Sequence, residues 1–224
     1  MPRSVPCLAA WLALSACSRP SRAPDPQIVQ VEEVSPRVVV RTARPTARPP
    51  ERNPQPTELA AIVRQAFADR DGATLARWAS AEGVRFTPYA WVSPEGDVEL
   101  QSEELRGAFD DPQVRTWGSF DGSGRPIELT FAAYVDRFVT PKRFVPGHDP
   151  QITQHAAETP GRLGSGNTMS NLPEIYPDAQ WIEFYVPGID PKYGGMDWAR
   201  LALVFVFESG TQKLRAVVHD EWTI

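Results

Sequence analysis

The C-terminal residues His219 and Asp220 are the most evident candidates for acid–base chemistry in this sequence. Successive side chains of a β-strand point to opposite faces of the sheet, so a regular strand would keep the two apart. The alternation over 214–224 places Asp220 on an apolar face and His219 among charged residues. A carboxylate on an apolar face must find hydrogen-bond donors or raise its pKa. Two interpretations stay open: Asp220 is an acid or base in a pocket, or it is a structural carboxylate held by backbone amides or an arginine.

Aromatic residues complete the candidate pocket. Its predicted lining residues are Asp220, Trp222, Tyr89, Trp91 and Trp181. Trp91 and Trp181 lie on faces of mixed polarity, where an indole can line a pocket or stack on a carbohydrate, and core packing is the commoner role of such residues. In an enzyme, Tyr89 or Asp136 would assist Asp220. The sequence identifies no further catalytic residue.

The remaining motifs are weak signals for bound groups. Asp121-Gly122-Ser123-Gly124 lacks the further acidic positions of a calcium loop and predicts a turn. The glycine-rich segment 164–167 has no following lysine and favours no phosphate site, and Ser165 has no nucleophile-elbow context. Asn167 and Asn171 are expected to brace the long loop over 140–179. The three histidines, His148, His155 and His219, are too widely spaced to predict a metal site. We therefore expect neither a metal nor a cofactor.

The first sixteen residues predict a secretory signal. Arg3 precedes a ten-residue apolar run over 7–16, which is too short to span a bilayer. The run ends in Leu14-Ser15-Ala16-Cys17, which resembles the box at which bacterial lipoproteins are acylated on cysteine. The alternative is an ordinary signal peptide cut after an alanine, with Cys17 incidental. Lipidation of Cys17, by palmitate and related acyl chains, would anchor the protein to a membrane of the cell envelope. The absence of aspartate after Cys17 favours the outer membrane if the host is Gram-negative.

Composition divides the rest of the chain at about residue 57. Segment 18–58 contains nine of the 23 prolines and seven arginines, a composition typical of a flexible tether. We assign 17–56 to the lipidated cysteine and this tether, with the strand-like stretches in 28–40 able to dock on a sheet edge. Residues 57–224 form a single predicted domain, whose 15 basic and 23 acidic residues from Leu59 onward argue against nucleic-acid binding.

The hydrophobic periodicity of 57–224 predicts helices followed by antiparallel strands. Expected helices are 58–70 capped by Thr57, a short helix around Leu75, one capped by Ser102 that extends through Phe109, and one capped by Thr130. Expected strands are 83–92, 181–186, 199–208 and 213–224, with a long loop over 140–179. The strand 199–208 is apolar on both faces over 201–207, which predicts a central place in the sheet. This order predicts the α+β class, with N-terminal helices packed on a curved antiparallel sheet.

Two resemblances add to this interpretation. The order of elements resembles the cone-shaped NTF2-like fold. Specific strings resemble a family of exported bacterial lipoproteins of uncharacterised function: 85–92, 117–124, Gly166-Asn167-Thr168 with Asn171, 195–198 and the terminal His219-Asp220-Glu221-Trp222-Thr223-Ile224. This family resemblance implies a shared fold and an extracytoplasmic location, and it implies no residue role.

Two functions remain in view. The first is a non-catalytic, lipid-anchored binding module of the cell envelope whose partner is a small ligand, a glycan or another envelope protein. The second is an envelope enzyme that uses Asp220 as an acid or base in an NTF2-like pocket, which rests on analogy of fold. The lack of an evident catalytic constellation favours the first.

Overall fold

The computed structural model describes residues 53–140, 150–156 and 169–223. These residues belong to the second of two compact units, Pro49–Ile224. Some predictions concern residues outside the described ranges: the signal peptide, Cys17, the tether up to residue 52 with 28–40, His148, Gly164–Thr168 and Ile224.

The elements follow one another in an order close to the predicted one. The helices are α1 (Pro56–Ala68), α2 (Gly72–Trp78), α3 (Ser102–Gly107), α4 (Phe131–Tyr134) continued by the π-helix η1 (Val135–Val139), α5 (Leu172–Ile175) and the 3₁₀ helix η3 (Pro191–Tyr193). The strands are β1 (Val84–Thr87), β2 (Val98–Leu100), β3 (Arg115–Ser119), β4 (Pro126–Leu129), β5 (Gln151–Ala156), β6 (Gln180–Val186), β7 (Ala199–Glu208) and β8 (Thr211–Glu221).

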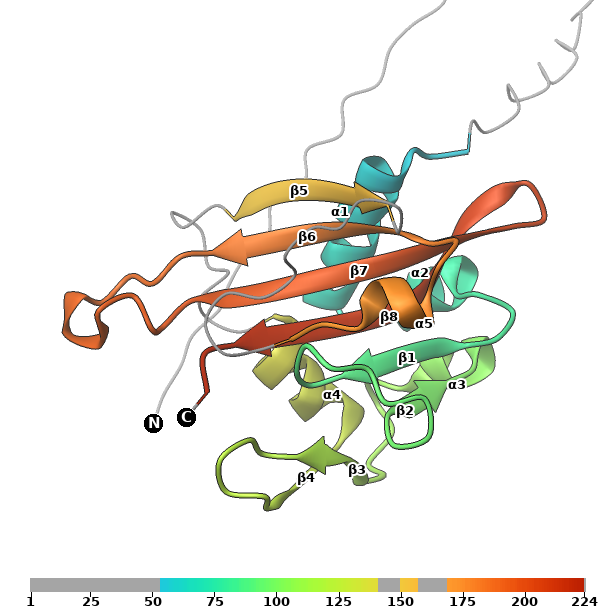
Figure 1. Cartoon of the computed structure of the whole chain (residues 1–224). Helices are drawn as coiled ribbons and strands as arrows, with labels where there is room; N and C mark the ends of the chain where they lie inside the picture. The colour runs from blue at the N-terminus through green and yellow to red at the C-terminus, as the bar shows by residue number, and fades with distance from the viewer. Residues whose placement is uncertain (1–52, 141–149, 157–168, 224) are drawn as a thin grey trace, which may run out of the picture. The chain divides into compact units, whose positions relative to one another are not determined.

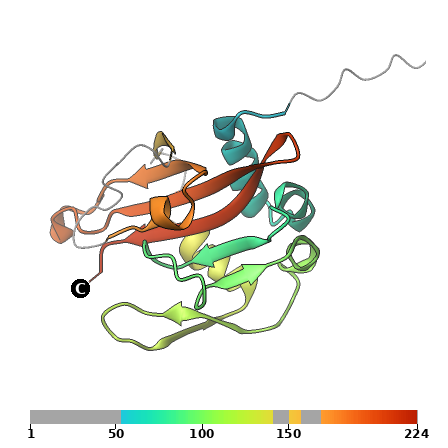
Figure 2. The same cartoon turned by 45° about the vertical axis from the view of Figure 1, so that its right-hand side comes forward.

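Six of the strands form one twisted sheet in the order β2-β1-β8-β7-β6-β5, and β3 and β4 form a separate hairpin (Figure 1). All neighbours in the large sheet are antiparallel except β1 and β8, which are parallel. The long strands β7 and β8 curve across the molecule, with helices packed on the sheet (Figure 2). The predicted α+β class is thereby confirmed.

Both faces of the sheet carry a buried apolar cluster. The larger cluster joins α1, α2, α3, α4 and the β3–β4 hairpin to one face of β1, β6, β7 and β8. The smaller cluster packs α5, through Leu172 and Tyr176, against the opposite face. Strand β7 is central as predicted, because it pairs with both β6 and β8. The polar residues Arg200, His219 and Asp220 in the middle of the sheet are therefore buried, whichever face they point to.

The helix caps differ from the prediction. Helix α1 begins at Pro56 and is capped by Gln55 rather than by Thr57, and Ser102 is the first residue of α3, whose cap is Gln101. At both helices the cap glutamine and a glutamate three residues later bond to each other's backbone amides. This reciprocal pair satisfies two amides at once, which a lone hydroxyl cannot do. The predicted cap of Thr130 on α4 is confirmed by its bond to the amide of Ala133.

Two predicted segments have different bounds. The strand expected over 83–92 ends at Thr87, because Pro88 has no amide hydrogen and the chain turns away from the sheet. The loop expected over 140–179 contains β5 and α5. Strand β5 was missed because residues 151–154 are all exposed and so show no apolar alternation. The hairpin β3–β4 was also missed, although the predicted turn at Asp121–Gly124 lies between its strands.

The face pattern predicted for β8 is wrong at its start. The register between β7 and β8 shifts at Arg215, which has no partner residue on β7. This bulge brings Leu214 into the larger cluster with Val217, whereas Ala216 and Val218 belong to the smaller one. A bulge adds one residue to a strand and reverses the alternation beyond it.

Candidate functional site

The structure separates the residues predicted to form one pocket. Asp220 lies on the α5 face of the sheet, where its side chain is 3% exposed and its Oδ2 lies 3.5 Å from Nη1 of Arg200. The cavity beside it measures about 10 Å³, which is room for about one water molecule. Trp181 is a fully buried core residue of the smaller cluster, and Trp222 is half-buried. Tyr89 and Trp91 lie elsewhere, in a larger pocket described below.

Asp220 belongs to a buried cluster of charges. Arg200 pairs directly across β7 and β8 with Asp220, and its Nε lies 3.3 Å from Oε1 of Glu183 on β6. The guanidinium also lies over the rings of Tyr185 and Trp198, at 5.8 and 5.5 Å. A buried arginine between two carboxylates and two rings fits the structural interpretation of Asp220. Asp136 is also remote from this cluster, because it forms a surface ion pair with Arg70 at 2.9 Å.

His219 points to the opposite face from Asp220, as strand geometry predicted. It is buried, however, with its ring 5.5 Å from that of Phe138, since η1 covers this face. Its Nε2 lies 3.6 Å from Oε2 of Glu221, whose carboxylate also accepts two bonds from Arg137. Burial alone would raise the pKa of Glu221, but hydrogen bonds from His219 and Arg137 outweigh it and lower the pKa to about 2.

An open pocket lies between the chain after β1 and the β3–β4 hairpin. We call it the aromatic pocket, and its volume is about 520 Å³. It is lined by Pro88, Tyr89, Ala90, Trp91, Asp97, Gly118, Ser119, Phe120, Asp121, Gly122, Gly124 and Met169. Pockets of roughly 300–1,000 Å³ are typical of small-molecule sites. Two of the strings that carry the family resemblance, 85–92 and 117–124, supply most of this lining.

One wall of the aromatic pocket is the loop 88–97, which is held in place by hydrogen bonds to side chains. Asn171 accepts a bond from the amide of Val92 at 2.8 Å and donates one to its carbonyl at 2.9 Å. The loop that Asn171 braces here is 88–97, whereas the prediction concerned the loop over 140–179. Asp97 accepts bonds through Oδ2 from the hydroxyl of Thr87 at 2.7 Å and from the amide of Ser93 at 2.8 Å. These bonds close the loop at both its middle and its end.

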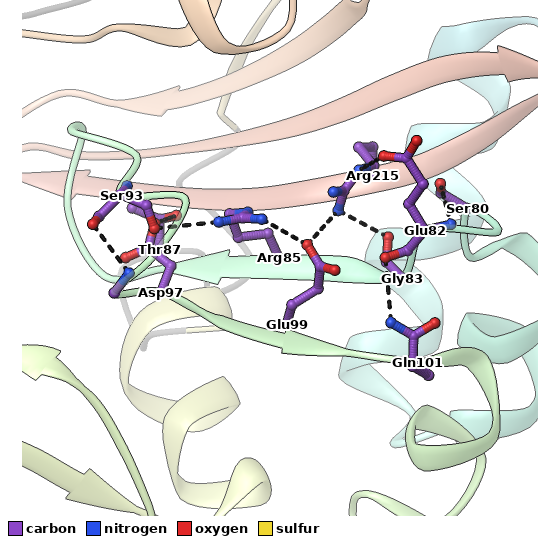
Figure 3. Close-up of polar contacts among 11 residues, drawn as sticks. Ser80, Glu82, Gly83, Arg85, Thr87, Ser93, Asp97, Glu99, Gln101 and Arg215 are labelled. Atoms are coloured by element: carbon purple, nitrogen blue, oxygen red, sulfur yellow. Dashed lines mark hydrogen bonds and ion pairs between the residues drawn. The ribbon is translucent and has the colours of Figure 1, made fainter.

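The loop is also tied to a network of arginines and carboxylates (Figure 3). Arg85 donates to the carbonyl of Ser93 at 3.2 Å and to Oε2 of Glu99 at 2.7 Å. The same Glu99 oxygen accepts from Arg215 at 2.8 Å, and Arg215 continues to Glu82 at 3.2 Å. The bulge in β8 positions Arg215 for this contact. A continuous chain of polar contacts therefore connects the wall of the aromatic pocket with β8.

A second pocket of about 550 Å³ lies on the other side of this network. Its charged lining residues have both signs: Glu82, Glu174, Glu208, Arg85 and Arg215. Both arginine side chains are only 10% exposed and already bond to Glu99. This arrangement neutralises the guanidinium groups within the protein and leaves them in a structural role.

The aromatic pocket is acidic. Its charged lining residues in the described part of the chain are Asp97 and Asp121. Burial raises the pKa of Asp97 although Ser93, Thr87 and Arg85 act in the opposite direction. Burial also raises the pKa of Tyr89, whose hydroxyl accepts a bond from the amide of Asp121 at 3.2 Å. Such a site repels anions and offers acceptors to hydroxyl or ammonium groups.

Asp97 is the site residue that sequence reasoning missed. It sits in the turn Pro94-Glu95-Gly96-Asp97, which carries no chemical motif. Its placement depends on the pairing of β2 with β1, which hydrophobic periodicity does not indicate. Among the described residues, no group of His, Cys, Asp and Glu is placed to hold a metal ion, and no helix has the length and hydropathy to cross a membrane.

Comparisons with known proteins identify no family. No protein-family model matches the chain, and no curated protein is significantly similar. Among solved structures, Aln2 from a Streptomyces species matches at 13% identity and a TM-score of 0.32 over 75% of this chain and 93% of that one. A chain whose name begins Rd1NTF2 matches at 11% identity and a TM-score of 0.30 over 73% of this chain and 96% of that one. Both TM-scores are low, so the α+β assignment rests on the elements and pairings of this chain itself.

Proposed function

We propose that this protein is a lipid-anchored binding module of the cell envelope that holds a small, non-anionic molecule in the aromatic pocket. The observation that carries the binding role is the pocket itself. It has the size of a small-molecule site, a wall fixed by Asn171, Asp97 and Arg85, and an exposed indole at Trp91. A rigid site loses little conformational entropy when its ligand binds.

The anchoring part of the proposal rests on the sequence of the first seventeen residues, namely the short apolar run and the box ending at Cys17. Acylation there would hold the protein at a membrane, with 17–56 as the lipidated cysteine and its tether. Radiolabelled palmitate should mark the wild-type protein and fail to mark Cys17→Ala. Equal labelling of both proteins would contradict the anchor without bearing on the pocket.

The binding part is tested by filling the pocket. Ser119 is exposed and lines the pocket from β3, so Ser119→Phe should occupy part of the volume without disturbing the core. Phe207→Ala is the matched control, because Phe207 is 68% exposed at the far end of β7 and does not line the pocket. The full chain would be incubated with small molecules extracted from envelopes and measured by native mass spectrometry. We expect a bound mass with wild type and Phe207→Ala that Ser119→Phe loses. Equal binding by all three proteins would refute this site.

A further inference from the structure

Trp91 presents its indole to solvent from a fixed position. The residue is 57% exposed, whereas its neighbours Ala90 and Val92 are 5% and 0% exposed. The side chain of Asn171 bonds to both the amide and the carbonyl group of Val92. Since both neighbours are anchored in the protein, the loop fixes the backbone at Trp91 and therefore the place from which its indole extends. An exposed indole on a rigid loop is a ready surface for an apolar ring face.

The other aromatic residues of the pocket are occupied by the protein. The ring of Tyr89 packs edge-on against Phe138, with centroids 6.3 Å apart, and its hydroxyl bonds to the hairpin. Phe120 is half-buried and packs against the larger core cluster. No other described aromatic ring contacts Trp91. Aromatic cages for quaternary ammonium groups surround the cation with several ring faces. One open face suits a flat, partly apolar ring instead.

The polar lining of the pocket includes a carboxylate, that of Asp97, with one oxygen to which no described residue donates a hydrogen bond. Oδ2 of Asp97 is taken by Thr87 and Ser93, which fixes the carboxylate. No described residue bonds to its second oxygen, Oδ1. The carboxylate of Asp121 differs, because its two oxygens accept bonds from Thr223 and from the amide of Gly122. A hydroxyl group that donates to Asp97 would form a charge-assisted hydrogen bond, which is stronger than a neutral one.

We propose that the ligand of the aromatic pocket is a neutral saccharide, with the apolar face of one pyranose ring stacked on Trp91 and a hydroxyl group donating to Asp97. A pyranose has an apolar C–H face and a rim of hydroxyl donors, which matches one indole beside one carboxylate. The acidic lining excludes sugars that carry sulfate, phosphate or carboxylate groups. The proposal rests on the proposed binding function of this pocket and specifies its ligand.

The test uses the full chain in mild detergent on an array of immobilised neutral and anionic glycans, with choline as a separate soluble probe. We expect binding to neutral glycans and not to anionic ones. Trp91→Ala should weaken this binding at least tenfold, and Asp97→Asn by about tenfold, since a charge-assisted bond becomes a neutral one. Phe207→Ala should bind like wild type. Trp91→Ala and Phe207→Ala should keep the wild-type melting temperature within a few degrees, because Trp91 and Phe207 are exposed.

The other outcomes are distinct. Choline binding that depends on Trp91, without glycan binding, would overturn the saccharide and retain the pocket as a site for a cation. Preference for anionic glycans would overturn the charge argument. If neither glycans nor choline bind in a Trp91-dependent way, the saccharide proposal fails. The mass-spectrometric comparison with Ser119→Phe then decides separately whether the pocket binds any small molecule.

Discussion

Replacement of Glu99 by glutamine should expose how much the arginine network stabilises the domain. Glu99 is 27% exposed, and one of its oxygens accepts from both Arg85 and Arg215, whose side chains are each 10% exposed. Glu99→Gln removes the charge but keeps the size of the side chain. It leaves two nearly buried guanidinium groups facing each other, with only the 76% exposed Glu82 as a remaining carboxylate for Arg215. Breaking a buried ion pair on one side costs about 3–5 kcal/mol, and the partial exposure of Glu99 puts the expected loss near the lower end, about 3 kcal/mol.

The assay is urea unfolding of the full chain at neutral pH, with Glu103→Gln as the matched control. Glu103 is 83% exposed and lies 3.7 Å from Arg106, a pair that should contribute about 0.5 kcal/mol or less. Adding Arg85→Met to Glu99→Gln should recover part of the loss, because one unpaired charge is removed. Equal small losses for Glu99→Gln and Glu103→Gln would refute the reasoning. Glu99→Gln should also weaken ligand binding, because it disturbs Arg85, which donates to the carbonyl of Ser93 in the pocket wall.

Three further substitutions test other parts of the structure. The pKa of Glu221 is about 2 in the folded protein, below its ordinary value of 4.5. The ionised carboxylate therefore stabilises the fold by up to about 3 kcal/mol above pH 4.5, and this stabilisation is lost as the pH falls toward 2. The free energy of unfolding, measured in urea between pH 7 and pH 2.5, should fall with pH, and it should fall less steeply in Glu221→Gln. An equal fall in the two proteins would contradict the stabilising role of ionised Glu221. Asn171→Ala should lower the unfolding free energy by about 2 kcal/mol and weaken ligand binding, because two bonds to Val92 are lost; wild-type stability and affinity would count against the bracing role. Asp220→Asn should lower the melting temperature and leave ligand binding unchanged, because Arg200 loses a countercharge; a stable variant that binds a substrate but no longer converts it would instead support acid–base chemistry.

The regular parts of the fold were predictable from the sequence. Helix α1 has apolar residues at helical spacing, β6 and β7 are largely apolar, and apolar and polar residues alternate over much of β8. Strand β7 was recognised as central because it is apolar on both faces. These signals are local, so each can be read without knowing what the segment packs against.

The candidate site was only partly predictable. Tyr89 and Trp91 were identified as pocket residues, but Asp220 and Trp181 were grouped with them although the sheet places these two in the core on another face. The bulge at Arg215 and the bracing of Val92 by Asn171 depend on partners far along the chain. Asp97 acquires its role only through contacts that hydrophobic periodicity does not record.

Oxidative footprinting of Trp91 and Met169 tests the binding function most directly. Both residues line the aromatic pocket, with 57% and 73% exposure, whereas Met196 and Phe207 are exposed at 44% and 68% and do not line it. Hydroxyl radicals would be applied to the full chain with and without envelope extract, and oxidation would be measured by peptide mass spectrometry. A ligand in the pocket should protect Trp91 and Met169 and leave Met196 and Phe207 unchanged. Equal oxidation of Trp91 under both conditions would contradict the account.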